Sequence, residues 1–200
     1  MKSWTLGITG GIGSGKTAVT QLFVDKGIEA IDADQAARWV VSKGKPALTK
    51  IEQHFGSEIL LADGNLNRAL LRQQIFQNPQ QRKWLENLLH PIIRQEICQF
   101  LENSSSPYNI LVSPLLIESK QYELVNRVLV IDTSESIQIS RSMQRDNNSE
   151  QQIKAIMQTQ LSRNERLHYA DDIIVNDQDI SHLEQQVEQL HQFYLTLCKN

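Results

Sequence analysis

The sequence is poor in the residues that mark special architectures. Its 200 residues include two cysteines, five prolines and nine glycines. Cys98 and Cys198 are too few for a disulfide framework and lack the spacing of a metal site, which favours a reducing compartment. With 40% hydrophobic and 22% charged residues, the composition excludes a collagen-like or largely disordered chain. The length is typical of one domain, or of one domain with a large insertion.

The sequence also lacks an excess of positive charge and long apolar runs. Twenty Lys and Arg residues against 23 Asp and Glu residues give a net charge of −3, so a polyanion can be bound only locally. No run approaches the roughly 18 apolar residues of a membrane span, and the N-terminal segment lacks the apolar core of a signal peptide. These absences predict a cytoplasmic protein with no nucleic-acid partner and no membrane association.

Short apolar segments alternate with helical patterns along the chain, as in an α/β protein. The sequence predicts five strands, at residues 4–9, 28–31, 110–112, 128–131 and 173–175. Alternation with helices favours a parallel sheet, in which ligands gather beyond the carboxyl ends of the strands. The last helix, at residues 180–197, has an apolar stripe; a coiled-coil seam would need more heptads, so the helix is expected to dock on the sheet.

About eighty residues between the second and third strands are typical of helices and turns. Pro46 begins one helix, Asn67 caps a second, and a third and fourth are expected at residues 79–90 and from Pro91 onward. We therefore predict a helical insertion at residues 35–107. The core then comprises residues 1–34 and 108–200.

Residues 10–17, GGIGSGKT, match the P-loop pattern G-x-x-x-x-G-K-[ST] in full. They follow an apolar strand and precede a helical pattern, which is the context that the motif requires. In such a loop the backbone N–H groups and the helix N-terminus bind phosphate, the lysine bridges the β and γ phosphates, and the threonine hydroxyl binds Mg²⁺. The sequence thus predicts ATP and Mg²⁺ as ligands of Gly11, Ile12, Gly13, Ser14, Gly15, Lys16 and Thr17.

Two other nucleotide-binding classes do not fit these residues. A G-x-G-x-x-G dinucleotide motif would need glycine at Lys16 if it began at Gly11, and at Ile12 if it began at Gly10. GTPase switches need D-x-x-G and N-K-x-D segments, and neither occurs. Hydride chemistry and a GTPase switch are therefore disfavoured.

Asp32 and Asp34 end the second strand, which neighbours the P-loop strand in many small P-loop kinases. One interpretation gives Asp34 the acceptor hydroxyl and lets Asp32 act through Mg²⁺-bound water. The other makes Asp34 the N-cap of the helix that follows. The residues alone leave both open.

Arg141 and Arg145 are four residues apart and share a helix face before a polar turn. Paired arginines at such a place can close over ATP and neutralise the transferring phosphoryl group, although a solvated basic face has the same pattern. Arg163 and Arg166 are weaker candidates that also fit surface charges. The segment 149–152, SEQQ, fits a helix capping box.

Two further segments are candidates for the cleft. His90 precedes Pro91 at the expected helix junction, where a lone histidine is more often a packed residue than a ligand. Leu116 lies in the segment 114–118, which follows the third strand and can present apolar surface and Glu118 there; ordinary core packing is the alternative.

An ordered series of motifs along nearly the whole chain resembles the dephospho-coenzyme A kinase family. The series comprises LGITGGIGSGK at 6–16, IDAD at 31–34, LNR at 66–68, LLHPI at 88–92, PLL at 114–116, RVLVID at 127–132, QRD at 144–146 and ADDII at 170–174. The resemblance implies ATP-dependent phosphorylation of the ribose 3′-hydroxyl of dephospho-coenzyme A, with Mg²⁺. It implies a P-loop core with a five-stranded parallel sheet, a helical substrate domain and a lid at residues 141–150.

The resemblance also implies roles for individual residues. It makes Asp34 the catalytic base, places Arg68 and His90 in the substrate domain, and puts Arg141 and Arg145 in the lid. The loop around Asn176 is expected near adenine. The protein would act on a small molecule as a monomer or weak homo-oligomer. A kinase for nucleoside monophosphates or other small metabolites, and a non-catalytic ATP-binding scaffold, stay open as alternatives.

Overall fold

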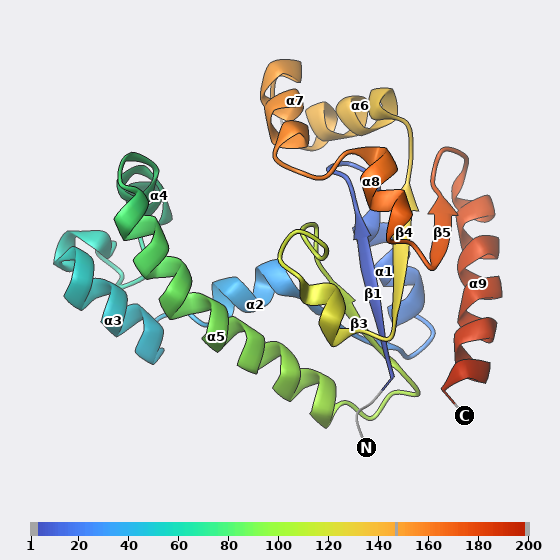
Figure 1. Cartoon of the computed structure of the whole chain (residues 1–200), viewed down its shortest axis with the longest axis horizontal. Helices are drawn as coiled ribbons and strands as arrows, with labels where there is room; N and C mark the ends of the chain where they lie inside the picture. The colour runs from blue at the N-terminus through green and yellow to red at the C-terminus, as the bar shows by residue number, and fades with distance from the viewer. Residues whose placement is uncertain (1–3, 147, 199–200) are drawn as a thin grey trace. The chain divides into compact units, whose positions relative to one another are not determined.

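The computed structural model describes residues 4–146 and 148–198 and contains a sheet of five parallel strands (Figure 1). The strand order is β2-β3-β1-β4-β5. Each strand lies within one residue of its predicted bounds, and the α/β fold predicted from the sequence is confirmed. The strands are β1 (Thr5–Gly10), β2 (Glu29–Asp32), β3 (Asn109–Val112), β4 (Arg127–Asp132) and β5 (Asp172–Val175).

The expectation that the second strand neighbours the P-loop strand is wrong, because β3 lies between β2 and β1. Val112 of β3 is in register with Asp32 on one side and Ile8 on the other. All four residues of β3 are buried, whereas those of β2 are partly exposed. The apolar strand therefore occupies the interior of the sheet, and the strand with Glu29 and Asp32 forms an edge.

The main hydrophobic core lies between the sheet and two helices, α1 (Lys16–Val24) and α9 (Ile180–Leu197). Alternate residues of the central strands point into this core. The predicted docking of the last helix is confirmed by three of its buried side chains, Leu183, Val187 and Tyr194. The core residues of the strands and of α1 include Leu6, Ile8, Ile110, Leu129, Ile131, Ile174, Val19 and Phe23.

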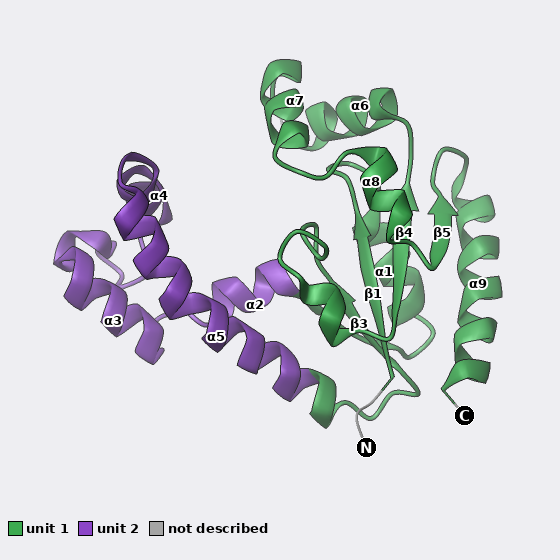
Figure 2. Cartoon of the chain, viewed as in Figure 1, with its two compact units in different colours: residues 1–32, 101–200 green, residues 33–100 purple. Residues whose placement is uncertain are grey.

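The chain folds into two compact units, which Figure 2 shows in different colours. The first comprises residues 1–32 and 101–200 and holds the sheet. Its other helical elements are the 3-10 helix η2 (Gln121–Leu124), α6 (Glu135–Asp146), α7 (Glu150–Gln158) and α8 (Arg163–His168). The capping box predicted at residues 149–152 is present at the start of α7, between Ser149 and Gln152.

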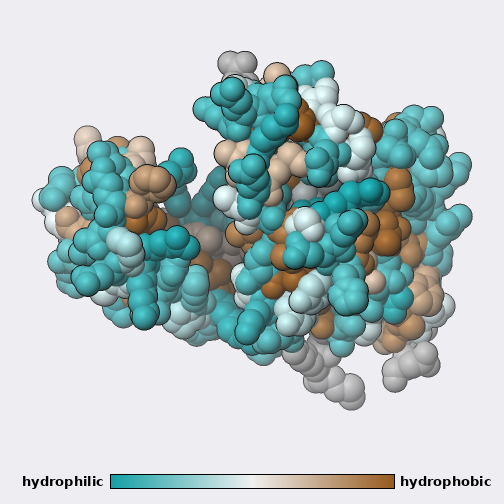
Figure 3. Space-filling model, turned by 45° about the horizontal axis from the view of Figure 1, so that its top comes forward, coloured by the Kyte–Doolittle hydropathy of each residue, from teal (hydrophilic) through white to brown (hydrophobic). Residues whose placement is uncertain are grey.

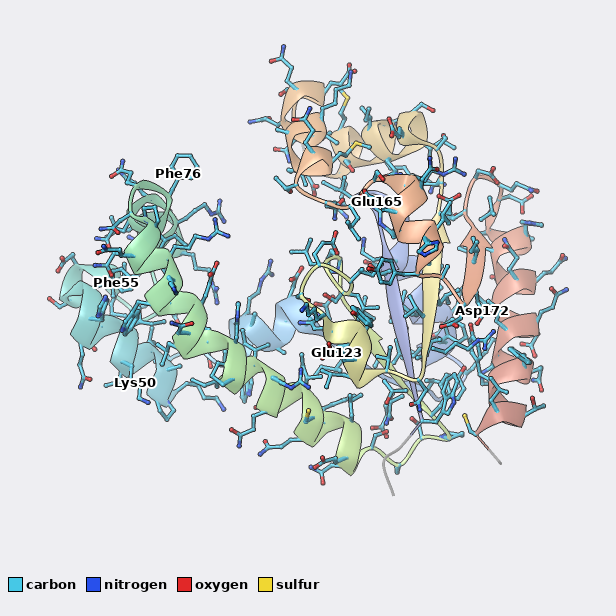
Figure 4. The ribbon with its side chains drawn as sticks, viewed as in Figure 1. Lys50, Phe55, Phe76, Glu123, Glu165 and Asp172 are labelled. Atoms are coloured by element: carbon cyan, nitrogen blue, oxygen red, sulfur yellow. The ribbon has the colours of Figure 1, made fainter. Side chains whose placement is uncertain are left out.

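The second unit, residues 33–100, is helical and has a core of its own. Its elements are α2 (Ala33–Trp39), α3 (Pro46–Phe55), the 3-10 helix η1 (Ser57–Ile59), α4 (Arg68–Gln77) and most of α5 (Pro79–Asn103). Asn67 caps α4 as predicted, since its side chain accepts from the backbone N–H of Leu70. Phe55 of α3, labelled in Figure 4, packs edge-on against Trp84 of α5. The unit begins and ends a few residues earlier than the insertion expected at 35–107.

The prediction of a helix junction at His90 and Pro91 is wrong, because α5 continues through both residues. Proline removes one helical hydrogen bond, which here would run to the carbonyl of Asn87. Asn87, His90 and Pro91 are all exposed, so water can satisfy that carbonyl. Burial of Leu85 and Ile97 on either side of Pro91 holds the helix together.

Hydrophilic residues predominate on the face shown in Figure 3, with hydrophobic patches between them. Within the described residues, no helix has both the length and the apolar character needed to cross a bilayer.

Candidate active site

The P-loop connects the end of β1 to the start of α1 through a tight turn. Gly13 and Gly15 have backbone φ angles of 71° and 98°, which are left-handed conformations that favour glycine. The N–H of Ser14 donates to the carbonyl of Gly11 at 3.2 Å. Gly15 is the N-cap of α1 and offers no side-chain cap, so the helix N-terminus is open to an anion.

The glycines of this loop are also required because other parts of the chain approach closely. A Cβ on Gly11 would lie 2.2 Å from Oε1 of Gln138, and one on Gly13 would lie 2.5 Å from the backbone oxygen of Gln138. Gln138 belongs to α6 and is 3% exposed. The first turns of α6 therefore press directly on the loop.

Lys16 places its ammonium group across the P-loop. Its Nζ donates to the carbonyls of Gly10 at 2.8 Å and Gly11 at 3.0 Å. Thr17 follows in the first turn of α1 and is exposed. An ammonium group, a hydroxyl and a helix N-terminus thus lie at one end of the sheet, which is the arrangement that binds a phosphate chain.

Asn176 joins three parts of the site. Its backbone N–H donates to the carbonyl of Asp132 at 2.8 Å, its Nδ2 donates to the carbonyl of Ser14 at 2.8 Å, and its own carbonyl accepts from Nη1 of Arg141 at 3.0 Å. Because Asn176 is buried, these bonds are shielded from water. The end of β5, the P-loop and α6 are therefore fixed together at this residue.

A cavity of about 360 Å³ opens beside Asn176. Apolar side chains form much of its wall, and Arg141 is one of its polar lining residues. Its lining residues are Gly15, Ala18, Arg141, Asn176, Gln178, Asp179, Ile180 and Leu183. An apolar cavity with a few polar groups next to a P-loop suits a flat heteroaromatic base.

The two arginines expected in the lid have different surroundings. Both belong to α6, as predicted, but only Arg141 lines the cavity. Arg145 is exposed and forms an ion pair with Asp146 at 2.6 Å, and its hydrogen bonds to that carboxylate raise the pKa of Arg145. Asn147, within the segment 141–150, lies outside the described residues.

Two arginines of α8, which the sequence pattern made weaker candidates, have specific partners in the structure. Arg163 is partly exposed but forms an ion pair with the buried Asp132 at 2.6 Å, so it is no ordinary surface charge. Arg166 is buried and donates to the carbonyl of Leu161 at 2.7 Å, and burial lowers the pKa of Arg166. The sequence held one signal for these arginines. They are three residues apart, just after a capping serine, and so share one face of a helix.

The candidate acceptor residues belong to different units. Asp32 ends β2 in the first unit, and Asp34 is an exposed residue in the first turn of α2, in the second unit. Because α2 begins at Ala33, the interpretation of Asp34 as an N-cap is wrong. Asp34 as the residue that takes the acceptor hydroxyl stays a prediction.

Three further candidates lie in surroundings that differ from one another. Arg68 begins α4, and its Nη2 donates to the carbonyl of Arg38 at 3.3 Å; burial and then the charge of Arg38 lower the pKa of Arg68. His90 is exposed in the middle of α5. Leu116 is fully buried and packs on Gly7 of β1, so contact with a substrate stays a prediction.

The model of the dephospho-CoA kinase (CoaE) family matches residues 4–182. A dephospho-CoA kinase of Hahella chejuensis is 51% identical over 199 residues, which cover 100% of this chain and 96% of the relative. One from Aggregatibacter actinomycetemcomitans is 51% identical over 201 residues, covering 98% of this chain and 97% of the relative. This chain belongs to the dephospho-CoA kinase family.

A solved structure agrees with this family assignment. A dephospho-CoA kinase from Campylobacter jejuni superposes with a TM-score of 0.72 at 29% identity, covering 96% of this chain and 97% of that one. The family predicted from the ordered sequence motifs is therefore confirmed, as is the prediction of a kinase that uses an alcohol acceptor.

The oxygen atoms predicted to bind a metal in this member of the dephospho-CoA kinase family suit Mg²⁺ better than a metal that needs three or more protein ligands. Among residues 4–146 and 148–198, no group of three His, Cys, Asp or Glu side chains could hold a metal ion. Mg²⁺ usually keeps several waters and binds one or two protein oxygens together with substrate phosphates. The Thr17 hydroxyl and the Asp32 carboxylate are donors of that kind.

Proposed function

We propose that this chain catalyses the ATP-dependent phosphorylation of the ribose 3′-hydroxyl of dephospho-CoA, giving CoA and ADP in the last step of CoA biosynthesis, in the cytoplasm. The observation that carries the proposal is the P-loop beside the 360 Å³ cavity, in a chain of the dephospho-CoA kinase family. The loop can bind the triphosphate and the cavity can bind the base, so the two together suit a nucleoside triphosphate.

The nucleotide would lie with its base in the cavity and its phosphates along the P-loop. Ala18, Ile180 and Leu183 offer apolar contact to the base, and Asn176 holds the loop that borders it. Lys16 would exchange its bonds to the Gly10 and Gly11 carbonyls for bonds to phosphate oxygens.

Mg²⁺ would be held by Thr17 and, directly or through water, by Asp32. When bound, it neutralises charge on the β and γ phosphates. Arg141, which lines the cavity, would add positive charge from the side of α6. Arg145 would have to leave its ion pair with Asp146 to do the same.

The second unit would bind the acceptor, and the segment 141–150 would act as the lid. Asp34 would accept a hydrogen bond from the ribose 3′-hydroxyl, hold its oxygen in line with the γ-phosphorus and take up its proton. The bond from this oxygen to phosphorus forms while the bond from phosphorus to the ADP oxygen breaks. Arg68, His90 and Leu116 are the proposed contacts to the rest of the substrate.

A direct test measures ADP formation by the purified full-length chain with ATP, Mg²⁺ and different acceptors. Dephospho-CoA should stimulate ADP release strongly, whereas AMP, shikimate, gluconate and a reaction without acceptor should not. Stimulation by one of the other acceptors alone would identify a different small-molecule kinase. Binding of ATP with no acceptor-dependent ADP would identify a scaffold.

A further inference from the structure

The pair of helices α6 (135–146) and α7 (150–158), together with Gln160 just after α7, contacts the P-loop at two places. We name this pair the α6–α7 hairpin; its helices pack against each other and lead into α8 (Figure 1). At its start, Gln138 presses on Gly11 and Gly13. At its exit, Oε1 of Gln160 accepts a hydrogen bond from the backbone N–H of Ile12 at 3.0 Å. The two contacts hold the hairpin on the phosphate-binding loop.

The segment that follows the hairpin is held by several hydrogen bonds. The N–H of Leu161 donates to Oε1 of Glu118 at 2.8 Å, and the carbonyl of Leu161 accepts from the buried Arg166 at 2.7 Å. Ser162 then starts α8 with a capping box. Gln160 is therefore presented to Ile12 by a segment that is tied by hydrogen bonds to Glu118 and α8, and its side chain has a defined partner.

The bond to Gln160 restricts the P-loop at its first turn. Ile12 lies between Gly11 and Gly13, where the chain turns from β1 toward the phosphate-binding amides. Its N–H is directed to Gln160, and the N–H of Ser14 is directed to the carbonyl of Gly11. These two N–H groups are thus directed to partners within the protein.

We propose that Gln160 is a positioning residue that couples the α6–α7 hairpin to the P-loop. Through Ile12 it keeps the loop in the conformation that binds triphosphate. This proposal rests on the proposed ATP-dependent kinase activity and adds a residue to it. Gln160 itself touches no reacting atom.

The test compares Gln160→Leu with Gln158→Leu, an exposed glutamine at the end of α7 that serves as the matched control. Loss of one hydrogen bond at a partly buried site should raise the KM for ATP about 3- to 10-fold in Gln160→Leu. The KM for dephospho-CoA should stay unchanged. Gln158→Leu should behave as the wild type in both respects.

Hydrogen exchange of the Ile12 amide, measured by NMR on the full chain, reports the bond directly. Exchange of this amide should accelerate at least 10-fold in Gln160→Leu but not in Gln160→Glu, which retains an acceptor oxygen. Ile12→Pro removes the donor, and adding Gln160→Leu to it should then cause no further rise in the KM for ATP.

Three results would overturn the proposal. These are an unchanged KM for ATP in Gln160→Leu, an equal change in Gln158→Leu, or an Ile12 amide that exchanges like an exposed one in the wild type. The last measurement decides the matter even if a variant fails to fold. Failure of the proposed function is a separate result, because it would be seen as a wild-type chain without dephospho-CoA-dependent ADP formation.

Discussion

Replacing Gly13 by alanine adds a methyl group at the place where α6 meets the P-loop. The new Cβ would lie 2.5 Å from the backbone oxygen of Gln138 and 2.6 Å from Oγ of Ser142. The Gln138 oxygen is part of a helix and cannot rotate away, so either the P-loop or α6 must move. Gly13 also has a φ of 71°, which a residue with a side chain adopts only at a cost.

The size of the effect follows from these two causes. A left-handed conformation costs an L-residue about 1–2 kcal/mol, and overpacking costs about 1–3 kcal/mol. Gly13→Ala should therefore lower the free energy of unfolding by about 2–5 kcal/mol. Gly27 provides the control, because its φ is 83° but nothing lies within 4 Å of an added Cβ. Gly27→Ala should cost only about 1–2 kcal/mol.

Two measurements on both variants separate the effects. Urea unfolding reports the loss of stability, and the KM for ATP in steady-state kinetics reports displacement of the P-loop. Gly13→Ala should raise the KM for ATP by about 10-fold or more, since the loop amides would no longer align with the phosphates. Gly27→Ala should leave the kinetic constants unchanged. Equal losses of stability in the two variants, or a normal KM for ATP in Gly13→Ala, would refute the close contact between α6 and the loop.

Three further predictions concern other parts of the chain. Asp34→Asn should retain ATP binding but lose about 10²-fold or more in kcat, and near-normal turnover would remove Asp34 from the acceptor site. Arg141→Leu should raise the KM for ATP more than Arg145→Leu does, because only Arg141 lines the cavity; the reverse order in steady-state assays would contradict this. His191 is buried, shares a hydrogen bond with the Tyr108 hydroxyl and has a pKa below its ordinary 6.5 because burial disfavours the imidazolium. Protonation is therefore easier in the unfolded chain, so stability should be full above about pH 6.5 and fall as the pH drops below it. His191→Gln should flatten this dependence in thermal melts between pH 7 and pH 5, and an unchanged slope would show that other groups cause it.

The sequence determined the parts of this protein that depend on local pattern. The P-loop residues 10–17 follow from spacing alone, because glycine adopts the left-handed backbone angles at Gly13 and Gly15 without strain and because lysine and threonine must follow at fixed positions. The five strands were predicted within one residue, since short apolar runs between polar turns have few alternatives. The helix caps at Asn67 and Ser149 depend on neighbours only three residues away, so they too could be predicted from the sequence.

Tertiary structure decided what depends on packing between distant segments. The position of β3 between β2 and β1 follows from which strand can be buried on both faces, a comparison that no single segment contains. The continuity of α5 through Pro91 depends on apolar contacts on both sides of the proline, which outweigh a local signal to stop. Only the folded chain distinguishes Arg141 from Arg145. The two are alike in sequence pattern, but Arg141 donates to the Asn176 carbonyl and Arg145 pairs with Asp146. The contacts of Gln138, Gln160 and Asn176 with the P-loop join residues more than 120 positions apart, and their side chains carry no local mark of that role.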